Sequence, residues 1–595
     1  MNHDLADDAA GARWLAALDA GAPWRDALEQ HLCAVDLVEA ERTMQVLKEG
    51  RGAWVPLAIE EPATRERPAV AWLFGNALSG TATVLARLGF RVVVFDPSAT
   101  RGAIAVHRDR WNGSGHVHHR VWSRALAASD LEGGDGPPAL AVVEGPVPNA
   151  LDPAGGLVRA LTECGARRVW HVGDNRLGYK RSTGVRADLR VRSPLRFVRD
   201  ALFGEGRTLA GFRRAVEPLG PARSLALYPH RWDFSLVVGL DDRRGPDLFL
   251  GPGERSNRVK IAGYRLGLFP WLTPSFAVGA PVPERSLVDR ILREVGVRTG
   301  EDPGRLEHLI ATRGNNALLL TNGTGGGTSS GRFAVHVPLG ADQERQVRRH
   351  HRLLERLRVG GGTRLATPEP LWSGAIDGVF VQVERRVGAI NAAQLVDERD
   401  RERVALPGCV ALLAAARADD GSPRVLDEVE LAEHVHGRAE AVAARAGREE
   451  TARAVHALAD RLAEALVNEP IPRVFGHGDL RAKHVAVETD GTPVALLDLG
   501  CAQPSDLPLV DLLNLVLHDR KDDARSSLGA AWIEARERRL PAALEAVLAD
   551  YVERLGLSRA YDDAIRAAYP LFVAAAAERY WDYSRPRWVH RQFAI

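Results

Sequence analysis

The chain has 595 residues, of which 45% are hydrophobic, and 78 Lys and Arg side chains balance 77 Asp and Glu side chains to a formal net charge of +1. This length exceeds that of one domain, so two to four domains are expected. Because the net charge is close to zero, the overall composition does not indicate binding to nucleic acid or to membranes.

The cysteines and the start of the chain indicate a cytoplasmic protein. The four cysteines are scattered without a C-x-x-C pair, and we expect them to be reduced core thiols. No apolar run reaches membrane-spanning length, and the acidic, Ala-rich first residues do not have the pattern of a signal peptide. The Ala-, Arg- and Gly-rich composition suggests a bacterial source with a GC-rich genome.

The first 280 residues have three patterns in succession. Residues 1–60 predict two short helices and then a hairpin about Gly50 and Gly52. In residues 61–245, apolar strands such as AVAWLFG and RVVVFD alternate with helical stretches such as TATVLARLGF. This alternation predicts an α/β, Rossmann-like doubly wound sheet. Residues 246–280 are rich in Gly, Pro and charge and predict a linker.

The remaining residues predict an α+β architecture of two lobes. Residues 281–390 contain a helix, two strands around a Gly-rich loop, a second helix and another strand, which is the pattern of a small sheet lobe. Residues 391–595 are mainly helical, and they enclose a short block of strands around the run FGHGDLRAKHVAVETDGTPVALLDLG. This order of elements is typical of a two-lobed, protein-kinase-like domain.

That run carries the strongest functional pattern of the chain. A His-Gly-Asp turn ends at Asp479, and a later apolar strand ends at Asp498. Two carboxylates at the ends of paired strands suit phosphoryl transfer. One can orient or deprotonate an acceptor hydroxyl, while the other holds Mg²⁺ on a nucleoside triphosphate.

The run resembles the aminoglycoside phosphotransferase and choline kinase-like family. The family pattern is His-Gly-Asp-Leu, an Asn five residues after the Asp, and a metal-binding Asp about twenty residues further on. The resemblance implies that Asp479 is the catalytic base, that Asp498 is a metal ligand, and that His477 and Asp511 are structural residues of the loop. It also implies that Arg481 stabilises charge on the transferring phosphoryl group.

One position of the run departs from the family. His484 stands where the family has its second metal ligand, an Asn. Mg²⁺ prefers oxygen donors, so an imidazole nitrogen is a poorer substitute. Either the site works with altered ligands, or the domain is a pseudokinase that kept the fold.

The predicted small lobe departs further. A Gly-rich turn should cover the phosphates with backbone N–H groups, and the candidates are Gly323, Gly325, Gly326 and Gly327. The next strand should present a Lys, but His336 occupies the place, and no Lys occurs from position 261 to 482. Arg332 or His336 would have to substitute. The following helix offers Glu344 or Glu355 as the partner acid, and the sequence does not choose between them.

Residues 71–96 resemble the first strand, loop, helix and second strand of class I S-adenosylmethionine-dependent methyltransferases. The resemblance implies that Gly75 and Gly80 form the cofactor turn and that Asp96 binds the ribose hydroxyls. Ala77 and Ser79 stand where that family usually has Gly, so the turn is degenerate. The domain either binds S-adenosylmethionine or is a Rossmann-like domain without a cofactor.

Together these patterns predict a small-molecule kinase that transfers the γ-phosphoryl group of ATP or GTP, with Mg²⁺, to a substrate hydroxyl. The alternatives are an inactive pseudokinase or binding module fused to a degenerate methyltransferase-like domain, and a methyltransferase whose kinase-like half binds substrate. We expect neither nucleic acid nor membrane as a partner. The acceptor, the choice of nucleotide and the oligomeric state stay open.

Overall fold

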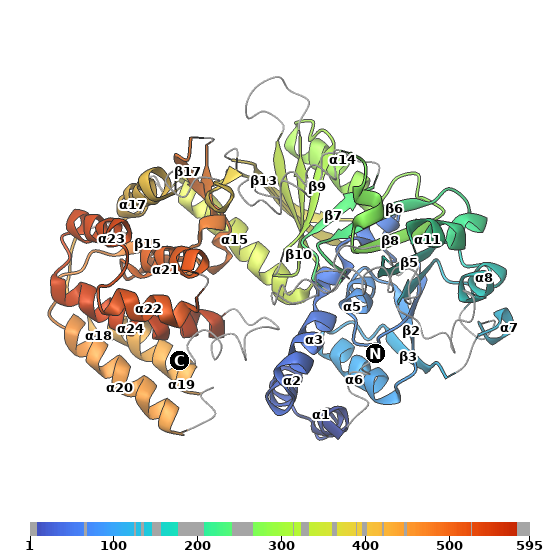
Figure 1. Cartoon of the computed structure of the whole chain (residues 1–595), viewed down its shortest axis with the longest axis horizontal. Helices are drawn as coiled ribbons and strands as arrows, with labels where there is room; N and C mark the ends of the chain where they lie inside the picture. Colours follow the sequence, from blue (N-terminus) through green and yellow to red (C-terminus); the bar gives the residue numbers. More distant parts are fainter. Residues whose placement is uncertain are drawn as a thin grey trace, which may run out of the picture. The chain divides into compact units, whose positions relative to one another are not determined.

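The computed structural model of the chain (Figure 1) describes residues 9–64, 68–123, 126–131, 136–145, 156–175, 208–231, 233–240, 266–312, 314–322, 332–359, 366–387, 390–395, 401–418, 422–444, 449–488, 490–524 and 526–579. The chain forms two compact units. The first unit is Met1–Arg345 with Leu371–Val383, and the second unit is Gln346–Pro370 with Glu384–Ile595.

The first unit begins with helices α1 (Ala9–Asp19), α2 (Trp24–Ala34), α3 (Leu37–Leu47), η1 (Glu49–Gly52) and α4 (Val55–Ala58). The predicted hairpin about Gly50 and Gly52 is therefore wrong. Glu49 and Arg51 are buried and form ion pairs with side chains further along the chain, so this segment packs on the sheet instead of pairing with itself.

Within the described residues, the first unit is built on a 13-stranded sheet with the order β12-β13-β11-β10-β9-β7-β6-β8-β5-β4-β1-β2-β3. Its strands are β1 (Val70–Phe74), β2 (Arg91–Asp96), β3 (Val117–Val121), β4 (Leu140–Glu144), β5 (Val169–Asp174), β6 (Arg223–Tyr228), β7 (Leu236–Gly239), β8 (Ser275–Ala280), β9 (Leu306–Ala311), β10 (Asn316–Thr321), β11 (Phe333–Pro338), β12 (Pro370–Ile376) and β13 (Val379–Arg385).

Strands β1 to β5 are parallel neighbours. Strands such as VAWLF and RVVVFD are apolar almost throughout because a parallel sheet is covered on both faces. Helices alternate with them, as the α/β pattern predicted. The helices of this unit are α5 (Gly80–Arg87), α6 (Ala99–Trp111), α7 (Ala128–Leu131), α8 (Gly156–Glu163), α11 (Leu209–Val216), η3 (Glu217–Leu219), α13 (Phe269–Leu272), α14 (Leu287–Thr299) and the start of α15 (Ala341–Val359).

The predicted linker at 246–280 contains a strand of the sheet. All residues of β8 are buried, and the strand lies between β5 and β6, antiparallel to both. Strands β6, β7, β9, β10 and β11 continue the sheet in antiparallel pairs. The strands expected to form a separate small lobe are thus an extension of the same sheet.

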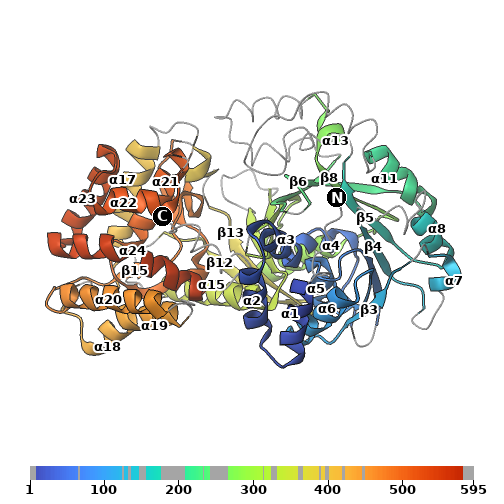
Figure 2. The ribbon, with the colours of Figure 1, turned by 60° about the horizontal axis from the view of Figure 1, so that its bottom comes forward.

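The second unit is mainly helical, and Figures 1 and 2 show its helices gathered in one body. They are residues 346–359 of α15, η5 (Ala392–Gln394), η6 (Arg401–Ala405), α17 (Leu406–Ala415), α18 (Glu428–Leu431), η7 (Ala432–His436), α19 (Gly437–Ala443), α20 (Glu449–Leu466), η8 (Ala482–His484), η9 (Leu499–Cys501), α21 (Val510–Ala524), α22 (Leu528–Arg536), α23 (Ala542–Leu555) and α24 (Arg559–Arg579).

Two small sheets accompany these helices. Strands β14 (Ile390–Asn391), β16 (Val485–Val487) and β17 (Pro493–Leu496) form one, and β15 (Val474–Gly476) pairs with β18 (Gln503–Asp506) in the other. Apolar residues of β15, β16 and β17 belong to the same buried cluster as those of α21, α23 and α24. The His-Gly-Asp loop joins this cluster through Leu480. In the described residues, no helix has both the length and the apolarity needed to span a membrane.

Candidate active site

The loop after β15 begins with a turn that only glycine adopts without strain. Gly478 has φ +80°, and a Cβ added there would lie 2.6 Å from the carbonyl oxygen of Cys501. Both the left-handed backbone and the close approach therefore require glycine. His477 and Asp479 are the residues directly before and after Gly478 in this turn.

Two side chains of helix α21 hold the loop through hydrogen bonds to its backbone. The carboxylate of Asp511 accepts the N–H groups of His477 and Gly478, the latter at 2.9 Å. One turn further along the helix, the Asn514 side chain donates to the carbonyl oxygen of Leu480 at 2.9 Å. Burial raises the pKa of Asp511 above its ordinary value, although both amide hydrogen bonds favour the ionised form. Asp511 thus fixes the backbone of the first two residues of the loop.

The side chain of Asp479 is partly exposed, and one of its two carboxylate oxygens is hydrogen-bonded. Its Oδ1 lies 2.7 Å from the guanidinium of Arg481, and both side chains are about one third exposed, at 32% and 31%. Among the described residues, Oδ2 has no hydrogen-bond partner. One carboxylate oxygen is thus oriented by Arg481, and the other is open to an incoming group.

His484 contacts the backbone of Asp479 on one side and the carboxylate of Asp498 on the other. Its Nδ1 is 2.6 Å from the carbonyl oxygen of Asp479, and its Nε2 is 3.6 Å from Oδ2 of Asp498. The ring stacks on that of His477 with centroids 5.5 Å apart. Burial lowers the pKa of His484 to about 4, so the ring is neutral near pH 7.

Asp498 has an exposed side chain and a left-handed backbone conformation. Its side chain is 70% exposed, and its φ of 58° and ψ of 59° are left-handed. Non-glycine residues in this conformation cluster at functional sites, where the surrounding structure holds them. Here the preceding carbonyl, that of Leu497, accepts a hydrogen bond of 2.8 Å from Nε2 of His477. The structure therefore brings Asp479, His484 and Asp498 together on one loop system.

A buried pair that was not identified from the sequence holds the residue after Asp498. His350 of α15 and Glu384 at the end of β13 are both buried, and Nε2 of His350 lies 2.7 Å from Oε2 of Glu384. Nδ1 of the same ring accepts the N–H of Leu499 at 3.0 Å. Val347, His350 and Leu354 share one buried helix face, and that spacing was the available signal.

The remaining small-lobe residues are placed as follows. Gly323, Gly325, Gly326 and Gly327 lie outside the described residues. His336, at the expected Lys position on β11, is hydrogen-bonded to Asn316 of β10 at 2.9 Å. Glu344 pairs with Arg87, and Glu355 lies 3.3 Å from His351.

The predicted cofactor residues of the amino-terminal sheet are engaged internally. Asp96 is fully buried and accepts hydrogen bonds from the N–H groups of Ala77 and Ser98 and from the Arg101 guanidinium. A Cβ on Gly80 would lie 1.8 Å from the carbonyl oxygen of Lys48. Both oxygens of Asp96 are thus occupied and the turn is packed against the amino-terminal helices, an arrangement that does not fit S-adenosylmethionine.

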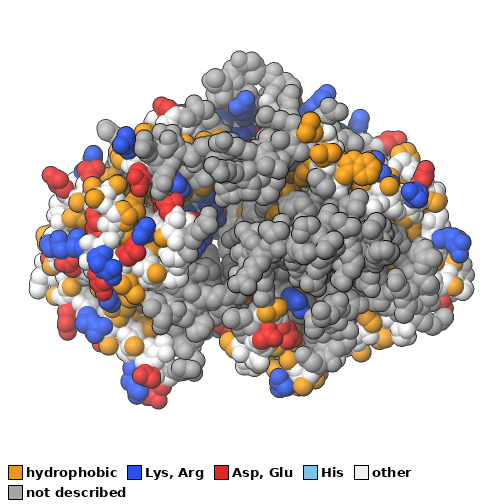
Figure 3. Space-filling model, in the orientation of Figure 1, with side chains coloured by type: hydrophobic (Ala, Val, Ile, Leu, Met, Phe, Trp, Pro, Cys, Tyr) orange, Lys and Arg blue, Asp and Glu red, His pale blue; other side chains and the backbone are white. Residues whose placement is uncertain are grey.

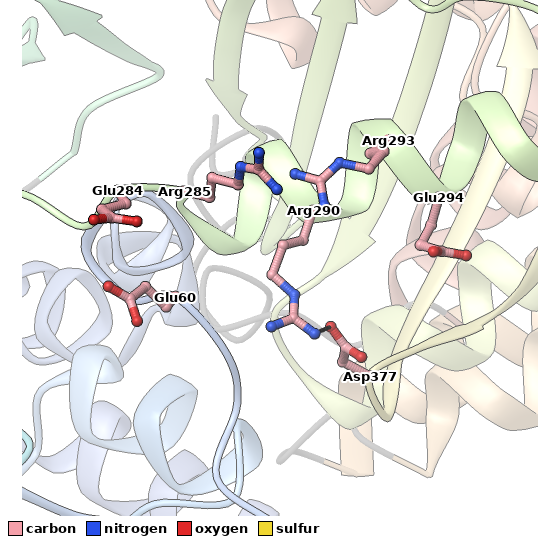
Figure 4. Close-up of a pocket in the computed structure, with 7 residues that line it drawn as sticks. All are labelled: Glu60, Glu284, Arg285, Arg290, Arg293, Glu294 and Asp377. Carbon is pink, nitrogen blue, oxygen red and sulfur yellow. Dashed lines mark ion pairs between the residues drawn. The ribbon is translucent and has the colours of Figure 1, made fainter.

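A groove of about 700 Å³ in the first unit is lined by Glu60, Glu284, Arg285, Arg290, Arg293, Glu294 and Asp377 (Figure 4). Arg290 pairs with Asp377 at 2.7 Å. Small-molecule pockets are mostly apolar with a few polar groups, whereas these residues are all charged and of both signs. Charges of both signs are also interspersed over the described part of the surface in Figure 3. We assign the groove no function.

A family model matches the part of the chain that carries the His-Gly-Asp loop. Residues 319–551 match the model of the phosphotransferase enzyme family, and this segment includes the whole loop. The resemblance predicted from the His-Gly-Asp run is thus confirmed, and it supports a kinase-like fold for this part of the chain. A comparison with curated proteins found no match.

Similar solved structures include proteins of both predicted kinds. An aminoglycoside phosphotransferase from Streptomyces rimosus is 18% identical, with 48% of this chain and 95% of that chain covered and a TM-score of 0.30. The bifunctional kinase-methyltransferase WbdD is 12% identical, with 87% and 88% covered and a TM-score of 0.22. A geranyl diphosphate C-methyltransferase from Streptomyces coelicolor is 13% identical, with 39% and 79% covered and a TM-score of 0.23. TM-scores this low carry no argument about function.

Proposed function

We propose that the chain is a small-molecule kinase that transfers the γ-phosphoryl group of ATP or GTP to a hydroxyl group. The observation that carries the proposal is the carboxylate of Asp479. It stands on a loop pinned by Asp511, it is 32% exposed, and one of its oxygens has no partner among the described residues. A general base needs this combination of fixed position and free oxygen.

In the proposed reaction, the acceptor hydroxyl donates a hydrogen bond to Oδ2 of Asp479. As the hydroxyl oxygen attacks the γ-phosphorus, its proton passes to Asp479, the bond to the β-phosphate bridging oxygen breaks, and the nucleoside diphosphate leaves. Arg481 orients Asp479 through Oδ1 and brings a positive charge close to the transferring group. Most of the rate gain would come from this positioning.

Asp498 and His484 fit a divalent cation. The exposed carboxylate supplies a negative oxygen, and Nε2 of the neutral imidazole faces it at 3.6 Å. A cation held there would neutralise phosphate oxygens of the nucleotide. The acceptor is proposed only as a small molecule with a hydroxyl group.

The test is nucleotide binding and turnover in Asp479→Asn. Calorimetry with ATP and a divalent cation should give binding in both the wild type and the variant, because Asp479 contacts the acceptor and not the nucleotide. Release of ADP, with aminoglycosides and macrolides as trial acceptors, should fall by about 10²–10⁴-fold in the variant. Asp490→Asn is the matched control, since Asp490 is an exposed acid of the β16–β17 turn.

Two outcomes oppose the proposal. Full turnover in Asp479→Asn would refute the base assignment. If neither ATP nor GTP binds, the result would instead favour the binding-module alternative, in which the kinase-like part is inactive.

A further inference from the structure

His484 directs its Nε2 toward Asp498. Nδ1 of the ring lies 2.6 Å from the carbonyl oxygen of Asp479. A carbonyl oxygen only accepts hydrogen bonds, so Nδ1 carries a ring proton. Nε2 is therefore the ring nitrogen left to bind a cation, and it faces Oδ2 of Asp498 at 3.6 Å. A nitrogen and a carboxylate oxygen that can both bind a cation thus lie close together.

The loop itself holds the ring in this orientation. The His484 ring stacks on the His477 ring with an interplanar angle of 13°. His477 is fixed in turn by its hydrogen bond to the carbonyl oxygen of Leu497, directly before Asp498. The pair of donors is thus preorganised by residues on both sides of it.

We infer that this site takes a transition-series divalent cation in preference to Mg²⁺, an inference that rests on the proposed phosphoryl transfer. Mg²⁺ is bound through oxygen donors, whereas an imidazole nitrogen suits transition-series cations, of which Mn²⁺ is the probe used in the test below. The separation of 3.6 Å between Nε2 and Oδ2 is within the span of two metal–ligand bonds of about 2.1 Å each. The exposure of Asp498 leaves the other coordination positions to phosphate oxygens and water.

The variant His484→Asn separates this role from simple bracing of the loop. An asparagine can still donate its amide N–H toward the carbonyl oxygen of Asp479, but it offers the cation an oxygen in place of a nitrogen. If His484 only braces the loop, the variant should leave the choice of cation unchanged. If its nitrogen binds the cation, the choice should move toward Mg²⁺.

The experiment measures the cation and its ligand directly. Protein saturated with ADP is titrated with Mn²⁺ and with Mg²⁺ by calorimetry, and the ratio of the two dissociation constants is compared between variants. Protein labelled with ¹⁵N only at histidine is then examined by pulsed EPR of bound Mn²⁺. We expect a ¹⁵N coupling in the wild type that His484→Asn abolishes, together with about a tenfold loss of preference for Mn²⁺. His456→Asn, at an exposed position of α20, is the control that should change neither readout.

A wild-type Mn²⁺–ADP complex without a ¹⁵N coupling would overturn the inference, and this result does not depend on whether the variant folds. Equal cation preference in the wild type and a folded His484→Asn would overturn it too. Either result alongside phosphoryl transfer leaves the proposed function intact. Failure of both ADP and GDP to bind with any cation would reject both.

Discussion

The contact between His350 and Leu499 leads to a prediction about stability and metal binding together. Two groups of the loop after Asp498 are held from α15: the Leu499 N–H by Nδ1 of His350 at 3.0 Å, and the Ala502 carbonyl oxygen by Arg349 at 2.9 Å. Glu384 orients the His350 ring from its other side. His350 is therefore expected to position the loop that carries Asp498.

The magnitude follows from the two hydrogen bonds of the ring. The bond to Glu384 is buried and involves a carboxylate, with side-chain exposures of 5% and 7%, so it should contribute about 1.5–3 kcal/mol. The bond from the Leu499 N–H should contribute about 0.5–1.5 kcal/mol. His350→Leu loses both, and its free energy of unfolding should fall by roughly 2–4 kcal/mol.

Two further substitutions separate the effect on stability from the effect on cation binding. His350→Asn keeps an acceptor near Nδ1 for the Leu499 N–H but is too short to reach Glu384, so it should lose stability while cation affinity stays near the wild-type value. His350→Gln keeps a donor for Glu384 but loses the acceptor, so it should keep more stability while cation binding weakens. Urea unfolding and calorimetric titration with Mn²⁺ and ADP measure the two quantities.

The matched control lies on the same helix. Glu355→Gln breaks another His–Glu pair, that of His351, but the Glu355 side chain is 57% exposed. Its free energy of unfolding should change by less than about 0.5 kcal/mol. Equal behaviour of the Asn and Gln variants, or a loss below about 1 kcal/mol in His350→Leu, would refute the positioning role.

Two more predictions concern the catalytic loop and the helix beneath it. Gly478→Ala adds a left-handed alanine and a clash with the carbonyl oxygen of Cys501, so it should lower the free energy of unfolding by about 2–4 kcal/mol and reduce turnover. Gly556→Ala has the same kind of φ but open space, so it should cost only about 1 kcal/mol in the same urea assay. Burial lowers the pKa of His518 to about 3 from 6.5, so the unfolded state binds more protons below pH 6.5 and stability falls as the pH drops from there toward 3. Between pH 7.5 and pH 5 this loss is about 2 kcal/mol, and it should be absent from His518→Leu in urea unfolding at the two pH values.

The proximity of the side chains on the His-Gly-Asp loop could be predicted because they are close in sequence or follow a helical period. His477, Asp479 and His484 lie within eight positions of one another, and Asp498 lies two residues after strand β17. Asp511 and Asn514 share one face of α21, which a spacing of three residues indicates. Local geometry therefore determined most of this site, and the family pattern supplied the roles.

The rest depended on contacts that no short window of sequence contains. Strand β8 has only six residues among Gly, Pro and charge, so its burial follows from the strands on either side of it. The partner acid of α15 was sought among Glu344 and Glu355, which lie on the helix itself. The buried pair instead joins His350 to Glu384, 34 positions away. Which face of α15 is buried is decided by tertiary packing.

The same reasoning bears on the alternatives to a kinase. Two fused, independent modules should each close their own sheet, but β7 pairs with β9 through Leu236 opposite Ile310 and Val237 opposite Leu309. The strands beside the family segment thus gain their hydrogen-bond partners from the amino-terminal sheet. At the other end of that sheet, Glu49 and Arg51 pair with Arg108 and Glu144 and occupy the edge where open α/β sheets bind their ligands. The pairing of β7 with β9 therefore argues against two independent modules, and the ion pairs at this edge argue against the methyltransferase alternative.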